Sequence, residues 1–243
     1  MTRLTTLPDN EAACARAASE TARAIEGARA QRGQAHVALA GGNTPRRAYE
    51  LLAPLVEDWS GVHLWYGDER CVAPDDPASN HRMVAESLLA ALDARGADPP
   101  PVEHRVLGEQ GPEAAARAYA HEMLQHIPAG EDGLPVLDLA LQGLGEDGHT
   151  ASLFPGHPEL EVRGAVCLPV RGAPKPPPDR VTLSLDVLRG ARAILMLATG
   201  AGKAEALAAV LKGPDPHVPA SLLSGGRLQI VSDDAAAAAQ SRA

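Results

Sequence analysis

The sequence predicts an α/β fold: a Rossmann-like, mostly parallel central sheet with helices on both of its faces. Two observations lead to this prediction. Short apolar segments recur along the chain and stop at Gly or Asp, and helix-like segments lie between them. Strands that alternate with helices imply a parallel sheet, because each helix carries the chain back to start the next strand.

The first two predicted elements are a helix and a strand. Residues 10–30 are rich in Ala, Glu and Arg and contain few turn formers, which is typical of a helix, and Gly33 marks its end. The apolar segment HVALA at 36–40 follows and predicts a strand.

The same alternation continues to the end of the chain. The further strand-like segments, each apolar and each ending at Gly or Asp, are 62–70, 137–145, 193–200 and 228–234. The further helix-like segments are 45–53, 79–94, 112–127 and 201–211. The alanine run at 235–239 predicts a terminal helix rather than a linker.

Four segments are less regular. Residues 102–107 and 165–170 are candidate strands, the second at an edge or antiparallel because Pro169 has no N–H to donate. The proline-rich segments 94–101 and 171–180 are predicted loops, and neither is long enough for a domain linker. Since the chain contains no internal repeat, we expect one domain over residues 1–243.

Composition and charge limit the classes of function. The formal net charge of −9 argues against nucleic acid as a partner but allows an anionic small molecule in a locally positive pocket. No apolar stretch approaches the ~18 residues of a membrane helix, and the N-terminus lacks a basic-then-apolar signal layout. We therefore expect a cytoplasmic protein without membrane contact. We also expect a monomer or a weak homodimer.

The cysteines predict neither disulfides nor a zinc site. Cys14, Cys71 and Cys167 are an odd number, lie far apart and form no C-x-x-C pair. No metal and no cofactor is expected.

The segment between the first predicted strand and its helix has the chemistry of an anion site. Gly41 and Gly42 let the backbone approach a ligand, Asn43 and Thr44 supply polar groups with Thr44 able to cap the helix, and Pro45 suits a first helical turn. Free N–H groups and the helix dipole there favour a negative ligand. A tight strand-to-helix turn without a ligand is the alternative.

Charged residues follow the second predicted strand. Asp68, Glu69 and Arg70 end the apolar segment VHLWY, and adjacent charges at a strand end indicate a functional site, since ligands bind beyond the carboxyl ends of parallel strands. The alternative is a surface ion pair, with Asp76 or Ser79 capping the next helix.

The third predicted strand end carries a histidine beside a carboxylate. Asp147, Gly148 and His149 lie on a predicted loop, followed by a short helix expected near Thr150. A histidine is suited to act as a general base at neutral pH, and a neighbouring carboxylate can orient it. A capping or core histidine is the alternative.

Two cations complete the set. Arg180 follows the proline-rich loop, and Lys203 lies in the first turn of a predicted helix, where a cation suggests an anionic partner because the helix dipole disfavours it. A surface lysine is the alternative for Lys203. The anion site, the cations and the histidine all lie at predicted strand ends or flanking loops, which strengthens their common interpretation.

Five segments together resemble the 6-phosphogluconolactonases of the glucosamine/galactosamine-6-phosphate isomerase superfamily. They are LAGGNTP, WYGDERCVAPDDPASN, LQGLGEDGHTASLFPG, RVTLSLDVL and LATGAGKAEALAAVLKG, and they span about residues 36 to 213. The related glucosamine-6-phosphate deaminases share the Gly-Gly loop, the D-G-H and the Arg and Lys positions. In the deaminase pattern, however, A-F-N-E-P with a catalytic glutamate follows D-G-H, and Asp-Glu-Tyr replaces Asp-Glu-Arg.

At both places this chain is similar to the lactonases. Residues 151–155 read A-S-L-F-P without a carboxylate, and Arg70 stands where the deaminases have Tyr. Asn43 departs from the Ser that is more frequent in the lactonase pattern, although its side chain can still cap or donate to a phosphate oxygen.

The resemblance implies a Rossmann-like fold, no required metal, and hydrolysis of 6-phospho-D-glucono-1,5-lactone to 6-phosphogluconate in the oxidative pentose phosphate pathway. The expected phosphate site comprises the Gly41–Thr44 loop with its N–H groups at Gly42, Asn43 and Thr44, together with Arg180 and Lys203. His149 is expected to take a proton from the attacking water.

Two assignments and two alternatives stay open. Either Asp147 or Asp68 orients His149, and Arg70 either faces the oxyanion or binds the phosphate. One alternative function is a glucosamine-6-phosphate deaminase or isomerase with the same pocket plan. The other is a non-catalytic sugar-phosphate sensor, which would normally carry a DNA-binding module that the sequence does not suggest.

Overall fold

A seven-stranded, all-parallel sheet runs through the computed structural model, which describes residues 2–225 and 227–239. In spatial order its strands are β1 (Arg3–Leu7), β10 (Leu228–Asp233), β9 (Ala193–Ala198), β6 (Leu139–Gly143), β2 (Ala35–Leu39), β3 (Val62–Tyr66) and β5 (Val102–Glu103). The interior strand β2 is buried along its whole length, as parallel strands covered on both faces are.

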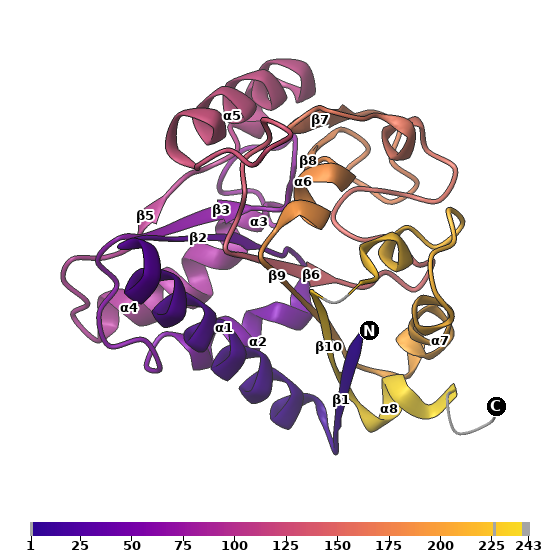
Figure 1. Ribbon diagram of the computed structural model, residues 1–243, viewed down its shortest axis with the longest axis horizontal. Helices are drawn as coiled ribbons and strands as arrows, with labels where there is room; N and C mark the ends of the chain where they lie inside the picture. The colour runs from indigo at the N-terminus through magenta and orange to yellow at the C-terminus, as the bar shows by residue number, and fades with distance from the viewer. Residues whose placement is uncertain (1, 226, 240–243) are drawn as a thin grey trace.

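Helices flank this sheet on both faces, so the predicted α/β class is confirmed (Figure 1). They are α1 (Asn10–Arg32), α2 (Asn43–Leu52), α3 (Asn80–Val84), α4 (Ala90–Ala94), α5 (Pro112–His126), α6 (Leu185–Gly190), α7 (Ala204–Lys212) and α8 (Asp234–Ala237). Helices α1 and α2 lie on one face, and α6 and α7 lie toward the other (Figure 1). Gly33 ends α1 in the left-handed conformation, with φ 77°, at the predicted position.

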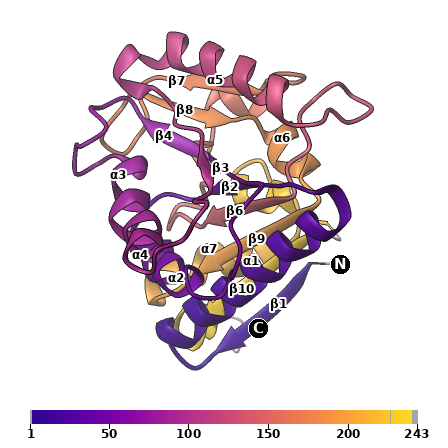
Figure 2. The same ribbon diagram turned by 90° about the vertical axis from the view of Figure 1, so that its left-hand side faces the viewer.

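A second, antiparallel sheet stands beside the first. It consists of β4 (Asp68–Arg70), β8 (Arg180–Leu183) and β7 (Cys167–Val170), and Figure 2 shows α5 lying over β7 and β8. The prediction for 165–170 is confirmed in both respects, since β7 is antiparallel to its neighbour and lies at the edge. Because β4 follows β3 after one residue, the small sheet begins at the carboxyl end of β3 and holds Asp68 and Arg70 there.

Several elements differ from the prediction. The helix expected over 79–94 is interrupted by a π-helical turn at Ala85–Leu89, and the strand expected over 102–107 is reduced to β5. The sequence predicts neither the strands β1 and β8 nor the helix α6. No helix starts near Thr150: this residue instead forms an isolated antiparallel bridge with Leu153, within a turn that holds Ala151 at φ 49°.

Aromatic residues are few, and all six are buried. Five of them belong to the main core: Tyr49, Trp59, Trp65, Tyr66 and Tyr119. Phe154 packs separately, with Val170 and Ala173, beneath the small sheet. Among the described residues, no helix is long and apolar enough to cross a membrane.

The strand order fixes where a ligand can bind. The chain leaves β2 toward β3 on one side and later returns to β6 on the other side of β2. At such a switch point the loops that follow the two strands diverge and leave a crevice beyond their carboxyl ends. The segments that follow β2 and β6 are 40–45 and 144–151, and they contain the Gly-Gly loop and the D-G-H segment.

Candidate functional site

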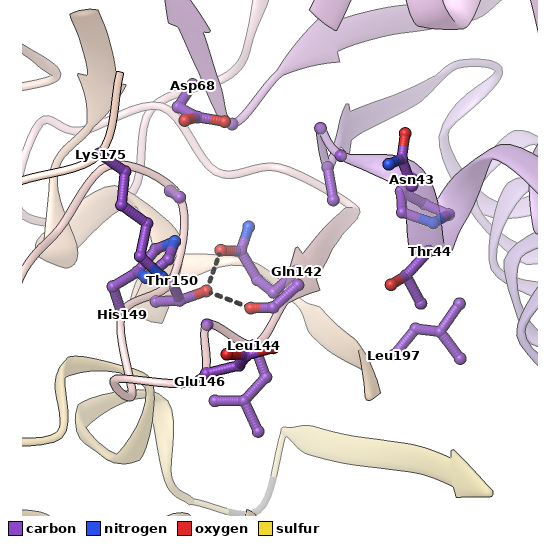
Figure 3. Close-up of a pocket in the computed structure, with 18 of the residues that line it drawn as sticks. Asn43, Thr44, Asp68, Gln142, Leu144, Glu146, His149, Thr150, Lys175 and Leu197 are labelled. Atoms are coloured by element: carbon purple, nitrogen blue, oxygen red, sulfur yellow. Dashed lines mark hydrogen bonds between the residues drawn. The ribbon is translucent and has the colours of Figure 1, made fainter. Parts of the chain in front are cut away.

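A cavity of about 330 Å³ lies at this switch point. Of the ten site residues predicted from the sequence, nine line it: Gly41, Gly42, Asn43, Thr44, Asp68, Arg70, His149, Arg180 and Lys203. Asp147 lies just behind the lining, in contact with His149. Figure 3 shows Asn43 and Thr44 on one side of the cavity and His149 with Lys175 on the other.

One end of the cavity is the open N-terminus of α2. Gly42 caps this helix through its backbone alone, with φ 93°, and among the described residues no side chain accepts a hydrogen bond from the first-turn N–H groups. Thr44 therefore does not cap the helix, contrary to the expectation, because the helix already begins at Asn43. The uncapped N–H groups and the positive end of the helix dipole face the cavity, as an anion site requires.

Gly41 is required for steric reasons. A Cβ at this position would lie 2.0 Å from Oδ1 of Asn80, the first residue of α3. The buried Asn80 side chain, whose Nδ2 donates to Asp68, therefore packs directly against the Gly41 backbone at the edge of the cavity.

Asp68 is buried and held by neutral donors. Its carboxylate accepts hydrogen bonds from Asn80 Nδ2 at 3.0 Å and Ser152 Oγ at 2.5 Å, and Nη1 of Arg180 lies 3.9 Å from Oδ2. The Asp68 carboxylate is therefore bound to Asn80 and Ser152 rather than to the His149 ring.

Glu69 has a local structural role. It accepts hydrogen bonds from the backbone N–H groups of Asn80 and His81, at 2.7 and 2.8 Å, and thereby satisfies the start of α3. Burial raises the pKa of this carboxyl above its ordinary value, against the lowering effect of these bonds. Ser79 is the N-cap of α3, as one of the alternatives from the sequence proposed.

The opposite end of the cavity is formed by His149. Its Nδ1 contacts Oδ1 of Asp147, and its ring lies 4.7 Å from the Phe154 ring. Because a carboxylate only accepts, Nδ1 carries the proton of the neutral ring and Nε2 keeps a lone pair. Burial lowers the pKa of His149, an effect that Asp147 opposes and Lys175 reinforces.

Arg180 is almost fully buried at the base of β8. Its Nε donates to Pro177 O at 2.9 Å and its Nη2 to Lys175 O at 2.8 Å, while Nη1 has only long contacts, at 3.4 Å to Ser152 Oγ and 3.9 Å to Asp68. Burial lowers the pKa of the guanidinium below its ordinary value. Most of its donors are thus bound to the proline-rich loop, and Nη1 is the group that remains for a ligand.

Arg70 and Lys203 add positive charge to the lining. Arg70 pairs with Arg180 in the register of β4 and β8, donates through Nη1 to Ala78 O at 2.5 Å, and has a buried Nε without a partner in the described part of the chain. Lys203 is half-buried and ends the 3₁₀ turn before α7, close to its predicted place. The cavity is therefore locally cationic within an acidic protein.

The sequence interpretation missed several lining residues. The single hydroxyl proton of Thr150 is shared between two acceptors, Gln142 Oε1 at 2.8 Å and Gly143 O at 2.9 Å from Oγ1 (Figure 3). Gln142 could have been identified from the sequence, because it is a polar residue at the end of an otherwise apolar strand. Glu146 and Lys175 also line the cavity, but only the folded paths of their loops bring them there.

Within residues 2–225 and 227–239, no group of three or more His, Cys, Asp or Glu side chains could hold a metal ion.

Comparisons with known proteins agree on one family. The family model described as glucosamine-6-phosphate isomerases/6-phosphogluconolactonase matches residues 8–231. A 6-phosphogluconolactonase of Streptomyces coelicolor is 38% identical over 96% of this chain and 92% of its own. The crystal structure of the devB protein superposes with a TM-score of 0.84 at 34% identity, covering 98% of this chain and 99% of the other. The 6-phosphogluconolactonase of Trypanosoma brucei gives a TM-score of 0.81 at 26% identity, with 98% of both chains covered.

Proposed function

The chain belongs to the family of the glucosamine-6-phosphate isomerases and 6-phosphogluconolactonases, and we infer that it is a 6-phosphogluconolactonase. It hydrolyses 6-phospho-D-glucono-1,5-lactone to 6-phosphogluconate, a step of the pentose phosphate pathway. The observation that carries this conclusion is one cavity with an open helix N-terminus on one side and a carboxylate-paired imidazole on the other. The first suits a phosphate, and the second suits the activation of water.

We propose that the phosphate binds at the N-terminus of α2. The N–H groups of Gly42, Asn43 and Thr44 would donate to its oxygens, and Lys203 would add a charge-assisted hydrogen bond. Arg180 would contribute through Nη1 alone, because its other donors bind the proline-rich loop. The phosphate is remote from the reacting bond, so its binding energy can serve to position the lactone ring.

Hydrolysis would then proceed by direct attack of water. Nε2 of His149 accepts a proton as the water oxygen bonds to C1, and the carbonyl becomes a tetrahedral oxyanion. When the oxyanion collapses, the bond between C1 and the ring oxygen breaks, and the imidazolium returns the proton to that oxygen. Asp147 orients the ring and stabilises its charged form, and Arg70 is the cation proposed nearest the oxyanion.

A covalent serine mechanism has little support. Ser152 is fully buried, and its hydroxyl donates to Asp68 rather than to a histidine. A serine nucleophile must reach the substrate carbonyl, and Ser152 is not among the residues that line the cavity. Trapping an acyl-enzyme on Ser152 would refute direct attack.

The alternative activities make different demands on the same cavity. A deaminase of this family would need a carboxylate after the D-G-H segment, where this chain has Ala151 through Pro155, with Phe154 packed against His149. A non-catalytic sensor would bind the phosphosugar without turnover.

One assay separates these possibilities. The acid released from 6-phosphogluconolactone is followed with and without the protein, and 6-phosphogluconate is identified as the product. Ammonia release from glucosamine 6-phosphate is measured in parallel. We expect protein-dependent acid release and no ammonia; an unchanged rate of lactone decay would contradict the proposed activity.

We further propose that one chain forms the complete site within one domain, in the cytoplasm, as a monomer or weak homodimer and without nucleic acid. The residues assigned a role border one cavity, apart from Asp147, which contacts His149 from behind the lining. Sedimentation at several protein concentrations tests the assembly state: a stable higher oligomer would contradict it.

A further inference from the structure

The proline-rich loop, residues 171–179, is tied down by Arg180. The guanidinium binds the carbonyls of Lys175 at 2.8 Å and Pro177 at 2.9 Å, and Ala173 N donates to Pro178 O at 2.9 Å to close the loop. Three consecutive prolines, 176–178, restrict the backbone further. The main chain at Lys175 is therefore fixed although its side chain is partly exposed.

From this fixed position, Lys175 reaches the pair of residues at the reacting end of the cavity. Its Nζ lies 3.5 Å from Oδ2 of Asp147, whose other oxygen contacts Nδ1 of His149. Figure 3 shows the Lys175 side chain extending toward His149. An ammonium, a carboxylate and an imidazole thus lie in series, and each oxygen of the carboxylate has its own partner.

We propose that Lys175 is a positioning residue that acts on His149 through Asp147. By holding Oδ2, it directs Oδ1 at the imidazole N–H and so keeps Nε2 as the acceptor. By offsetting the charge of Asp147, it favours the neutral ring, which is the form that can take a proton from water. This inference rests on the proposed role of His149 as general base.

The charges around His149 decide the sign of the effect. Asp147 lies on the same loop as His149, Lys175 lies on the proline-rich loop and Asp68 lies on β4. Arg180 on β8 lies over the Phe154 ring, with its guanidinium carbon 5.4 Å from the ring centroid. The two carboxylates raise the pKa of His149 and Lys175 lowers it, in addition to the larger lowering by burial. Glu146, Arg70 and Lys203 line the same cavity. Removing the ammonium therefore raises the pKa of His149.

The first experiment follows the His149 ring by NMR titration of the free protein, with His149→Gln to assign its signal. Lys175→Met should raise the titration midpoint by about half a pH unit, an about threefold change in the proton dissociation constant for a partly exposed ion pair. Lys175→Arg should restore the midpoint, and Lys212→Met, at the far end of α7, should not change it. An unchanged midpoint in Lys175→Met would overturn the proposal.

A second variant tests the route through Asp147. In an Asp147→Asn background, Lys175→Met should shift the His149 midpoint less than it does alone, because only the direct repulsion between ammonium and imidazole is left. Equal shifts in both backgrounds would show that Asp147 does not transmit the effect.

The kinetic readout links this chain of residues to turnover. In Lys175→Met, the acidic limb of kcat/KM should move to higher pH together with the NMR midpoint, while KM at the plateau stays within about twofold. A raised KM with a fixed limb would identify Lys175 as a substrate ligand and overturn the proposal. The NMR titration needs no substrate. If the midpoint shifts as expected but the protein does not hydrolyse the lactone, the result would refute the proposed function and leave the role of Lys175 in place.

Discussion

Gly145 and His149 are in such close contact that only a glycine fits at position 145. A Cβ there would lie 2.0 Å from Nδ1 of His149 and 2.5 Å from Oδ1 of Asp147. Both distances are shorter than any contact between non-bonded atoms of these types. The backbone of Gly145 also donates from N to His149 O at 2.8 Å. The imidazole of His149 and the carboxylate of Asp147 therefore pack directly against the Cα of Gly145.

Gly145→Ala should consequently displace the His149 ring and lower kcat. A misplacement of about 1 Å at a catalytic group can cost on the order of 100-fold, so a loss of this size is expected while phosphate binding is retained. The measurement is kcat and KM for the lactone beside Gly27→Ala, a helical glycine with open space around its Cβ position. Wild-type turnover in Gly145→Ala would show that the ring orientation does not limit the reaction.

His149→Ala should lower kcat by ~10²–10⁴-fold, the usual contribution of a general base. The binding of 6-phosphogluconate, measured by calorimetry, should change little because the phosphate end of the cavity is untouched. Near-normal turnover in His149→Ala would show that His149 is not the general base.

Lys203→Ala should raise KM first. Removing one charge-assisted hydrogen bond to phosphate, worth about 1.5–3 kcal/mol, corresponds to a loss of affinity of roughly 10- to 100-fold. Lys212→Ala, at the end of the helix that follows Lys203 and outside the cavity lining, is the matched control and should keep the wild-type KM. A fall in kcat with unchanged KM would place Lys203 at the reacting bond instead.

The parts of the fold and site that follow from local patterns could be predicted from the sequence. The alternation of apolar strands with helices determines a parallel sheet, and the carboxyl ends of its strands determine the edge where a ligand binds. Gly42, Asp68 and His149 all lie at such ends, so their meeting around one cavity could be expected. Strand β1 escaped prediction because it is a polar, half-exposed edge strand.

Contacts between distant segments could not be predicted in the same way. Whether Asp147 or Asp68 faces His149 depends on Ser152 and Asn80, which bind Asp68 from two other segments. Lys175 was assigned only to a loop, because its approach to Asp147 depends on a buried Arg180 that binds backbone carbonyls. A hydrogen bond of this kind leaves no periodic pattern in the sequence from which it could be predicted.

A histidine outside the cavity makes stability depend on pH. His36 on β2 is buried, stacks on His63 of β3 at 4.7 Å between ring centroids, and accepts a hydrogen bond at Nδ1 from Trp65 Nε1 at 3.2 Å. Because the indole N–H can only donate, this contact requires an unprotonated Nδ1. Burial, together with neighbouring histidines, lowers the pKa of His36 to about 4.

Acid should therefore unfold the protein in part through His36. A folded pKa below the unfolded value of about 6.5 means that the unfolded chain binds more protons between pH 6.5 and 4, so stability is full above 6.5 and lost as pH falls. For His36 alone the loss between pH 7.5 and 5 is about 2 kcal/mol, measurable by urea unfolding. His36→Gln should reduce the difference between the two pH values by that amount, whereas substitution of the exposed His217 by Gln should preserve it. An unchanged difference in His36→Gln would mean that other groups account for the acid sensitivity.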